Sequence, residues 1–142
     1  MKTFSLQTRL YSGQGSLAVL KRFTNKHIWI ICDGFLARSP LLETLRQALP
    51  ADNRISVFSE ITPDPTIHTV VQGIAQMQAL RPQVVIGFGG GSAMDAAKAI
   101  VWFSQQSGID IETCVAIPTT SGTGSEVTSA CVISDPDKGI KY

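Results

Sequence analysis

The sequence lacks the features typical of membrane, secreted and nucleic-acid-binding proteins. No apolar run approaches the ~20 residues that a membrane-spanning helix needs, and the N-terminus has no basic-then-apolar secretion pattern. The 12 basic and 11 acidic residues nearly balance, and the basic ones are scattered singly, so neither a nucleic acid nor an anionic membrane is expected as a partner. We expect a soluble, cytoplasmic protein.

Candidate metal ligands and nucleophiles are also few. The three cysteines, Cys32, Cys114 and Cys131, form no CxxC pair, and their odd number argues against a disulfide framework, so we expect buried thiols in strands. His27 and His68 have no HxxxH or HExxH partner, which favours surface or core positions over metal ligation. No metal site with three protein ligands is predicted, and neither a GxSxG nor a Cys-His pattern indicates hydrolysis.

Predicted strands and helices alternate along the chain. The continuous apolar run HIWIICD is typical of a strand buried on both faces of a parallel sheet. Strands are predicted over 4–11, 27–33, 54–61, 83–88 and 113–117, and helices over 17–23, 41–49, a longer stretch after Pro65, and 92–105. This alternation predicts an α/β fold, a Rossmann-like doubly wound parallel sheet with helices on both faces. Since no linker interrupts the pattern, residues 1–142 are expected to form one domain.

Two dipeptides predict helix starts. Ser39 and Pro40 fit an N-cap hydroxyl followed by proline at the first helical position. Asp64 and Pro65 repeat this pattern before the longest helix. The apolar residues of that helix recur at 3.6-residue spacing and are expected to share one buried face: Ile67, Val70, Val71, Ile74 and Met77.

The C-terminal residues predict a hairpin that is only begun. The segment 129–135 has the composition of a strand, DPDKG is turn-like, and 140–142 would start the partner strand. Because a folded protein rarely stops within a strand, this pattern indicates a truncated chain.

A glycine run lies where a predicted strand meets a predicted helix. Gly89, Gly90 and Gly91 would let the backbone approach a phosphate closely, with Ser92 as the N-cap of a helix whose positive end stabilises the anion. Asp95, three residues after Ser92, would complete a capping box. Serine at position 92 breaks the GxGxxG pattern, and no P-loop lysine follows. The alternative is a tight turn that binds no ligand.

Two further features end predicted strands. The segment IPTTSGTGSEVTSA offers many hydroxyl and NH donors, which suit ribose and phosphate oxygens, although it could instead be a plain surface turn. Asp33 could accept hydrogen bonds from an adenosine ribose and repel a 2′-phosphate, which would favour NAD over NADP; it could equally be a simple cap.

Two motifs together resemble the iron-containing (group III) alcohol dehydrogenase family. GGGSAMDAAK at 89–98 matches the family motif GGGSxxDxAK, and IPTTSGTGSEVT at 117–128 matches PTTxGTGSEVT. Both agree at every defining position and occur in the family's usual order. The opening segment, 1–23, most resembles members that act in bacterial propanediol-utilisation microcompartments. The whole chain resembles the N-terminal NAD-binding domain of such enzymes.

The resemblance implies roles for individual residues. Asp33 matches an acid that contacts the adenosine ribose, and the hydroxyl loop matches one that surrounds the pyrophosphate and nicotinamide ribose. The implied cofactor-binding residues are Asp33, Gly90, Gly91, Ser92, Thr119, Thr120, Thr123, Val132 and Lys141. Asp64 departs from the asparagine that members often carry before this proline, so it either adds a charge at the cofactor edge or caps its helix.

The resemblance also implies chemistry that this chain does not contain. In such enzymes an Asp and three His of a following helical domain hold Fe²⁺ while hydride passes to the nicotinamide. None of these ligands is present here, so no catalytic or metal-binding residue is predicted. The implied substrates are propionaldehyde and 1-propanol, interconverted with NADH by the full protein, whereas the 142-residue chain alone would only bind nucleotide.

Alternatives and partners follow from the same resemblance. Zinc-dependent relatives such as glycerol dehydrogenases share the fold but vary the glycine motif. The chain could also belong to another class of protein, as a non-catalytic nucleotide-binding module or as a docking module for microcompartment shell proteins. In that case NADH would not change the affinity of the chain for the shell protein. A homo-oligomer is also expected, because apolar surface would be exposed where a helical domain docks.

Overall fold

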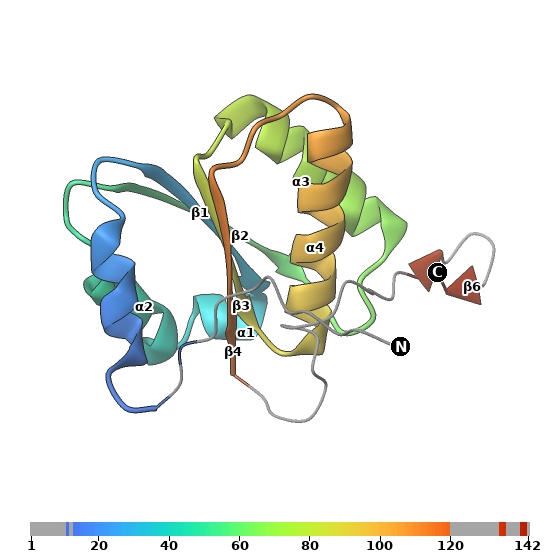
Figure 1. The fold of residues 1–142 in the computed structure, drawn as a ribbon. Coiled ribbons are helices and arrows are strands. Elements are labelled where there is room, and N and C mark those ends of the chain that lie inside the picture. Colours follow the sequence, from blue (N-terminus) through green and yellow to red (C-terminus); the bar gives the residue numbers. More distant parts are fainter. Residues whose placement is uncertain (1–10, 12, 120–133, 136–139, 142) are drawn as a thin grey trace, which may run out of the picture.

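The computed structural model describes residues 11, 13–119, 134–135 and 140–141 (Figure 1). In chain order the elements are the 3-10 helix η1 (Ser16–Arg22), β1 (His27–Asp33), α1 (Gly34–Ala37), α2 (Pro40–Ala48), β2 (Arg54–Ile61), α3 (Ile67–Leu80), β3 (Val84–Gly89), α4 (Gly91–Gln106), β4 (Thr113–Pro118), β5 (Ser134–Asp135) and β6 (Ile140–Lys141). The predicted alternation is confirmed. No helix in these ranges is both long and apolar enough to cross a membrane.

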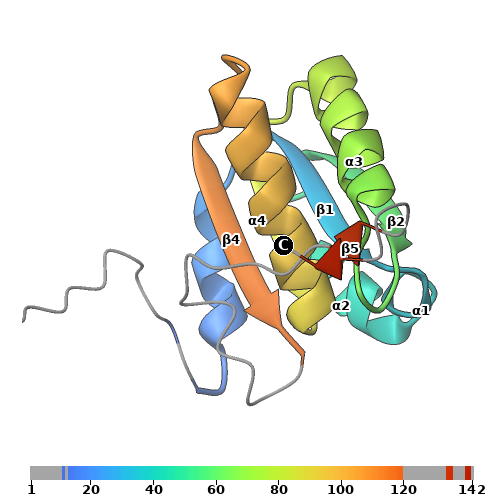
Figure 2. The same cartoon turned by 90° about the vertical axis from the view of Figure 1, so that its right-hand side faces the viewer.

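The first four strands form one parallel sheet in the order β2-β1-β3-β4. Helices cover both of its faces: η1 and α2 lie on one side, and α3 and α4 lie side by side on the other (Figures 1 and 2). The chain therefore winds outward in both directions from the central strands β1 and β3. This arrangement confirms the predicted doubly wound parallel α/β fold.

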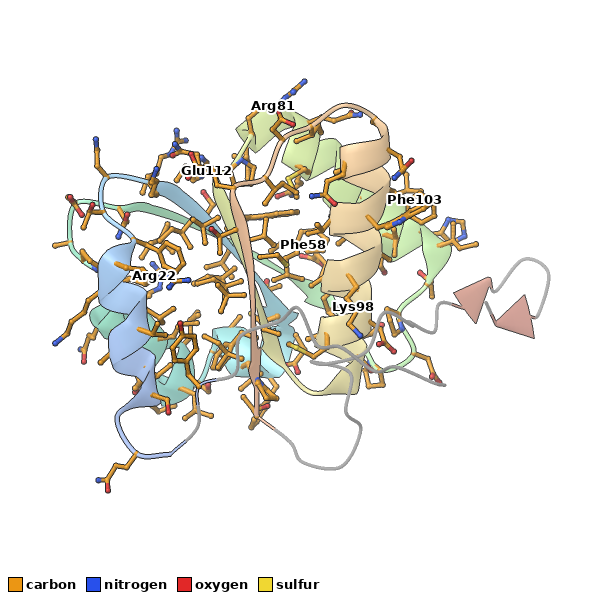
Figure 3. The ribbon with its side chains drawn as sticks, in the orientation of Figure 1. Arg22, Phe58, Arg81, Lys98, Phe103 and Glu112 are labelled. Carbon is orange, nitrogen blue, oxygen red and sulfur yellow. The ribbon has the colours of Figure 1, made fainter. Side chains whose placement is uncertain are left out.

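Two apolar layers hold the helices to the sheet. Along β1, Ile28 and Ile30 point into the layer under η1 and α2, while Trp29 and Ile31 point into the layer under α3 and α4. All four side chains are fully buried, as expected for an interior strand of a parallel sheet. Phe58 of β2 packs on Trp29 with ring centroids 5.7 Å apart and lies on the α4 side of the sheet (Figure 3). Packing in these two layers holds the sheet in place, including the carboxyl ends of its strands, where the candidate site lies.

Helices α3 and α4 approach each other at Gly73. A Cβ at this position would overlap Ile100 Cδ1 and lie 2.8 Å from Ile100 Cγ1, so only glycine leaves room for this contact. On the same helix Val70 and Met77 are buried. Val71, expected on that face, is 57% exposed, so the buried stripe of α3 is narrower than predicted.

Two predicted capping interactions are wrong in detail. Ser39 is the N-cap residue of α2 and Pro40 its first residue, as predicted, but the Ser39 hydroxyl donates to the Leu36 carbonyl at 2.9 Å and accepts from no NH of the helix. At α3 the N-cap is Thr66, whose Oγ1 accepts from the Thr69 NH at 3.2 Å. Asp64 lies two residues earlier with φ +54°, so it does not cap α3. The Thr66 hydroxyl satisfies an NH group of the first turn, and the Asp-Pro pair precedes this cap.

The remaining expectations have mixed outcomes. The predicted C-terminal hairpin is confirmed, because β5 and β6 pair antiparallel with Ser134 opposite Lys141. Cys32 is a buried strand thiol as predicted, but Cys114 of β4 is exposed. Cys131 and all but the last residue of the predicted strand over 4–11 lie outside the described residues, and that last residue, Tyr11, is in no strand.

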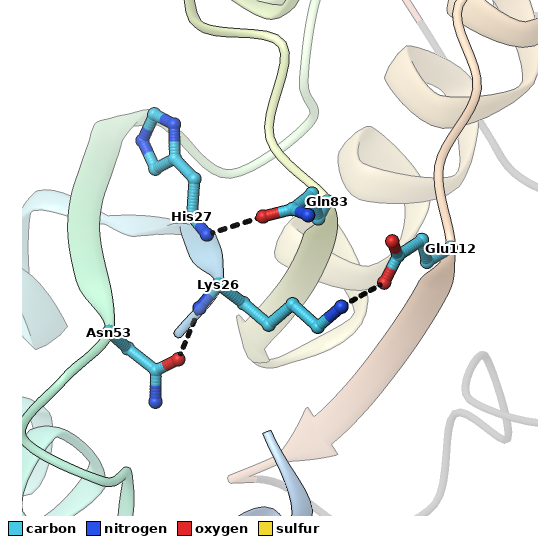
Figure 4. Close-up of polar contacts among 5 residues, drawn as sticks. All are labelled: Lys26, His27, Asn53, Gln83 and Glu112. Carbon is cyan, nitrogen blue, oxygen red and sulfur yellow. Dashed lines mark hydrogen bonds and ion pairs between the residues drawn. The ribbon is translucent and has the colours of Figure 1, made fainter. Parts of the chain in front are cut away.

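Polar contacts tie together the amino ends of the parallel strands (Figure 4). The Lys26 backbone NH donates to Asn53 Oδ1 at 2.9 Å, and the His27 NH donates to Gln83 Oε1 at 3.0 Å. Lys26 Nζ also lies 3.0 Å from Glu112 Oε2. Side chains from the segments before β1, β2, β3 and β4 therefore close this edge of the sheet.

Candidate nucleotide-binding site

The carboxyl edge of the sheet brings the predicted motifs together. Strands β1, β3 and β4 all end there, and α1 and the first turn of α4 lie beside those ends (Figure 1). After β1 the chain continues to β2 on one side, whereas after β3 it continues to β4 on the other. The ends of β1 and β3 thus flank the point where the strand order reverses, which is where open α/β sheets bind ligands.

The glycine turn presents the first backbone NH donors of α4 at this point. Strand β3 ends at Gly89 and α4 begins at Gly91, so the N-cap is Gly90, not Ser92 as predicted. The Ser92–Asp95 capping box is therefore also wrong, because it requires Ser92 to precede the helix. Gly90 has no side chain to cap α4, and the NH groups of the first turn cannot be satisfied within the helix. These donors and the positive helix end suit an anion.

Glycine at position 89 is required by both conformation and space. Gly89 has φ +142°, a value that residues with a side chain rarely adopt. A Cβ there would lie 3.0 Å from Ala93 Cβ and 3.1 Å from Leu36 Cδ1. The end of β3 therefore packs directly on α4 and α1. Close packing on both helices fixes the position of the turn relative to the end of β1.

A hydrogen bond joins the two predicted loops. The Thr119 NH donates to the Gly89 carbonyl at 2.8 Å, and Pro118 lies opposite Gly89 in the β3–β4 register. Thr119 is exposed at the start of the hydroxyl-rich segment. The beginning of that segment thus lies against the glycine turn. Thr120, Thr123 and Val132 lie outside the described residues, and Lys141 is described only by its backbone in β6.

Asp33 ends β1 and caps a helix that the sequence analysis missed. Its Oδ1 accepts from the Leu36 NH at 2.7 Å, which makes it the N-cap of the four-residue helix α1. The capping alternative for Asp33 is therefore correct. The ribose alternative also remains, because a carboxylate has two oxygens and several acceptor sites. The Asp-Gly sequence at 33–34 after a buried strand was the signal that a cap follows.

The environment of Cys32 makes it a poor nucleophile or ligand. Burial, with a smaller contribution from the neighbouring Asp33 charge, raises the pKa of the Cys32 thiol to about 11. The side chain is fully buried and stays protonated at neutral pH. Within the ranges that the structure describes, no three His, Cys, Asp or Glu residues are grouped so that they could hold a metal ion.

Comparisons with known proteins agree with this geometry. The family model of the iron-containing alcohol dehydrogenases matches residues 7–142. The 1-propanol dehydrogenase PduQ of Salmonella typhimurium is 96% identical over all 142 residues, which span 38% of its length. The fold matches an iron-containing alcohol dehydrogenase from Thermococcus thioreducens (TM-score 0.86, 24% identity, 99% of this chain and 42% of that one). It also matches a sulfoacetaldehyde reductase from Bifidobacterium kashiwanohense in complex with NAD⁺ (TM-score 0.84, 24% identity, 100% and 42%).

Proposed function

Because the chain belongs to the iron-containing alcohol dehydrogenase family, we propose that residues 1–142 are the NAD-binding domain of an enzyme that interconverts propionaldehyde and 1-propanol. The substrate pair is suggested by the relative that is named a 1-propanol dehydrogenase, of which this chain spans 38%. NAD is suggested by the structural neighbour in complex with NAD⁺ and by the open donors at the carboxyl edge. The chain's own share of the reaction is to bind and orient the dinucleotide.

Each part of the site suits one part of NAD. Gly90, Gly91 and Ser92 would hold the pyrophosphate at the positive end of α4. Asp33 would accept hydrogen bonds from the adenosine ribose at the end of β1. The proposed contacts to the pyrophosphate and the nicotinamide side come from Thr119, Thr120, Thr123, Val132 and Lys141. When bound, NAD supplies the hydride acceptor and Fe²⁺ supplies a Lewis acid.

The observation that carries the proposal is the hydrogen bond from Thr119 to Gly89. It fixes the start of one donor-rich segment against the other, beside the reversal of strand order. A single glycine turn would also suit a tight turn without ligand. Two such segments held together at the preferred ligand position of this fold favour a dinucleotide.

Substitution of Gly90 tests the proposal by separating binding from folding. Gly90 has extended backbone (φ −88°), in which Asn and Asp are both good N-caps, so Gly90→Asn and Gly90→Asp should each leave α4 as stable as before. Only aspartate adds a negative charge where the pyrophosphate would lie. We expect Gly90→Asp to bind NADH at least about tenfold more weakly than Gly90→Asn, since each 1.4 kcal/mol of repulsion is a factor of ten.

The measurement is energy transfer from Trp29 and Trp102 to NADH during titration, with urea unfolding to check stability. No saturable signal in the unchanged chain would contradict nucleotide binding. Equal affinities of the Asn and Asp variants would contradict the placement of the pyrophosphate at α4.

A turnover assay tests whether this chain binds the nucleotide without catalysing the reaction, as proposed. The described residues offer no metal cluster, so we expect the 142-residue chain with added Fe²⁺ to bind NADH but not to oxidise 1-propanol. The assay follows NADH absorbance with 1-propanol and NAD⁺. Measurable oxidation would show that this chain carries catalytic groups that the proposal does not give it.

A further inference from the structure

Opposite charges flank the short helix at the end of β1. Asp33 caps the start of α1 with its carboxylate, and Arg38 is the C-cap residue at the other end. Arg38 is exposed, and no carboxylate in the described part of the chain lies within ion-pair distance of its guanidinium. Among the described residues this cation has no carboxylate partner, and it belongs to the same short helix that Asp33 caps.

Gly34, at the start of α1, leaves room for the guanidinium of Arg38. A Cβ built on Gly34 would lie 3.3 Å from Arg38 Nη1 and 3.8 Å from Nη2, so the guanidinium lies directly over the residue that follows Asp33. The same Cβ would lie 3.6 Å from the Ser59 carbonyl, so Gly34 also lies close to β2. The side chain folds back along α1 toward the carboxyl edge of the sheet.

We propose that Arg38 is a specificity-determining residue, which partly offsets the repulsion between Asp33 and a 2′-phosphate on the adenosine ribose. This inference rests on the proposed function, because it needs the ribose at Asp33. The carboxylate favours a free 2′-hydroxyl, which donates to it, and disfavours a phosphate. The guanidinium has five donors in a planar fork that matches phosphate oxygens. Asp33 alone makes the site prefer NADH, and Arg38 sets how strongly NADPH is rejected.

Variants that remove one charge at a time separate the effects of Asp33 and Arg38 on nucleotide specificity. Asp33→Asn removes the charge but keeps an oxygen that can accept from the Leu36 NH, so α1 stays capped. Arg38→Ala removes the guanidinium from an exposed position. Arg54→Ala removes the same charge at the opposite, amino edge of the sheet and serves as the matched control. Circular dichroism and urea unfolding check that each variant is folded.

The readout is the ratio of NADPH affinity to NADH affinity, measured by tryptophan energy transfer. We expect Asp33→Asn to raise this ratio about tenfold, and Arg38→Ala in that background to lower it again by about tenfold, as one lost charge-assisted phosphate contact implies. In the same background, Arg38→Lys should give a ratio between those of the arginine and alanine chains, because lysine keeps the positive charge but lacks the planar fork of donors. Arg54→Ala should leave the ratio unchanged.

Two results would overturn different claims. If the Asp33→Asn chain binds NADH, and Arg38→Ala in that chain does not lower the ratio of NADPH affinity to NADH affinity, Arg38 has no part in specificity. If the unchanged chain binds neither nucleotide, the proposed function itself fails.

Discussion

Replacement of Gly89 by alanine should destabilise the chain through two separate effects. The backbone at φ +142° costs a residue with a side chain about 1–3 kcal/mol. The new methyl group would lie 3.0 Å from Ala93 Cβ and 3.1 Å from Leu36 Cδ1, and such overpacking costs about 1–3 kcal/mol more. We therefore expect Gly89→Ala to lower the free energy of unfolding by about 2–6 kcal/mol, the sum of the two effects, which urea denaturation would measure as a shifted midpoint.

Gly87→Ala is the matched control for the steric effect. A Cβ at Gly87 would lie 3.0 Å from Ala97 Cβ and 3.3 Å from Met94 Cε, so the crowding is similar, but the backbone of Gly87 has no positive φ. Gly89→Ala should therefore be the more destabilising variant by about 1–3 kcal/mol. Equal midpoints for the two variants would refute the claim that the turn needs the conformational freedom of glycine.

Three further predictions concern other parts of the chain. Burial and, to a smaller extent, the Arg54 charge lower the pKa of His27 below its ordinary value of 6.5. Its contribution to stability is therefore complete above pH 6.5 and is lost as the pH falls through the lowered pKa. His27→Gln should flatten this dependence in urea titrations at pH 7.5 and 5.5, and unchanged curves would contradict it. Cys32→Ser should not change the number of thiols that react with Ellman's reagent in the native state, but should lower it by one in urea, because Cys32 is buried and its pKa is raised to about 11. Gly73→Ala should lower the free energy of unfolding by about 1–3 kcal/mol despite the higher helix propensity of alanine. Ile100→Val in that background should recover part of this loss, because it removes the Cδ1 atom that the new methyl group would meet. If the effects of the two substitutions on the free energy of unfolding simply add, the contact is excluded.

The order and positions of the sheet strands could be predicted from the sequence, because buried strands leave continuous apolar runs in it. The apolar runs of β1 and β3 were located to within a residue, since interior strands of a parallel sheet tolerate few polar side chains. The sequence also indicated the edge at which we propose that the ligand binds, because donor-rich segments followed two predicted strands. That these strands are neighbours and that Thr119 bonds to Gly89 required the structure.

Local geometry at helix starts was predicted less well. The helix α1 has four residues, too few for a hydrophobic period, and only the cap at Asp33 marks it. At α3, Asp64 and Thr66 both fit an N-cap, and only the hydrogen bond to Thr69 distinguishes them. Several residue types suit the same cap, so the sequence fixes its position only to within about two residues.

The error at α4 changes the chemistry assigned to the turn. With Ser92 as the N-cap, its hydroxyl and the Asp95 carboxylate would use some of the first NH groups of the helix. With Gly90 there, the N-cap residue has no side chain that could use those donors, and Ser92 lies inside the first turn with its own NH among them. The observed start of α4 therefore leaves more donors for an anion than the predicted one. It also explains why a charge at position 90, and not a change at Ser92, is the stronger test of pyrophosphate binding.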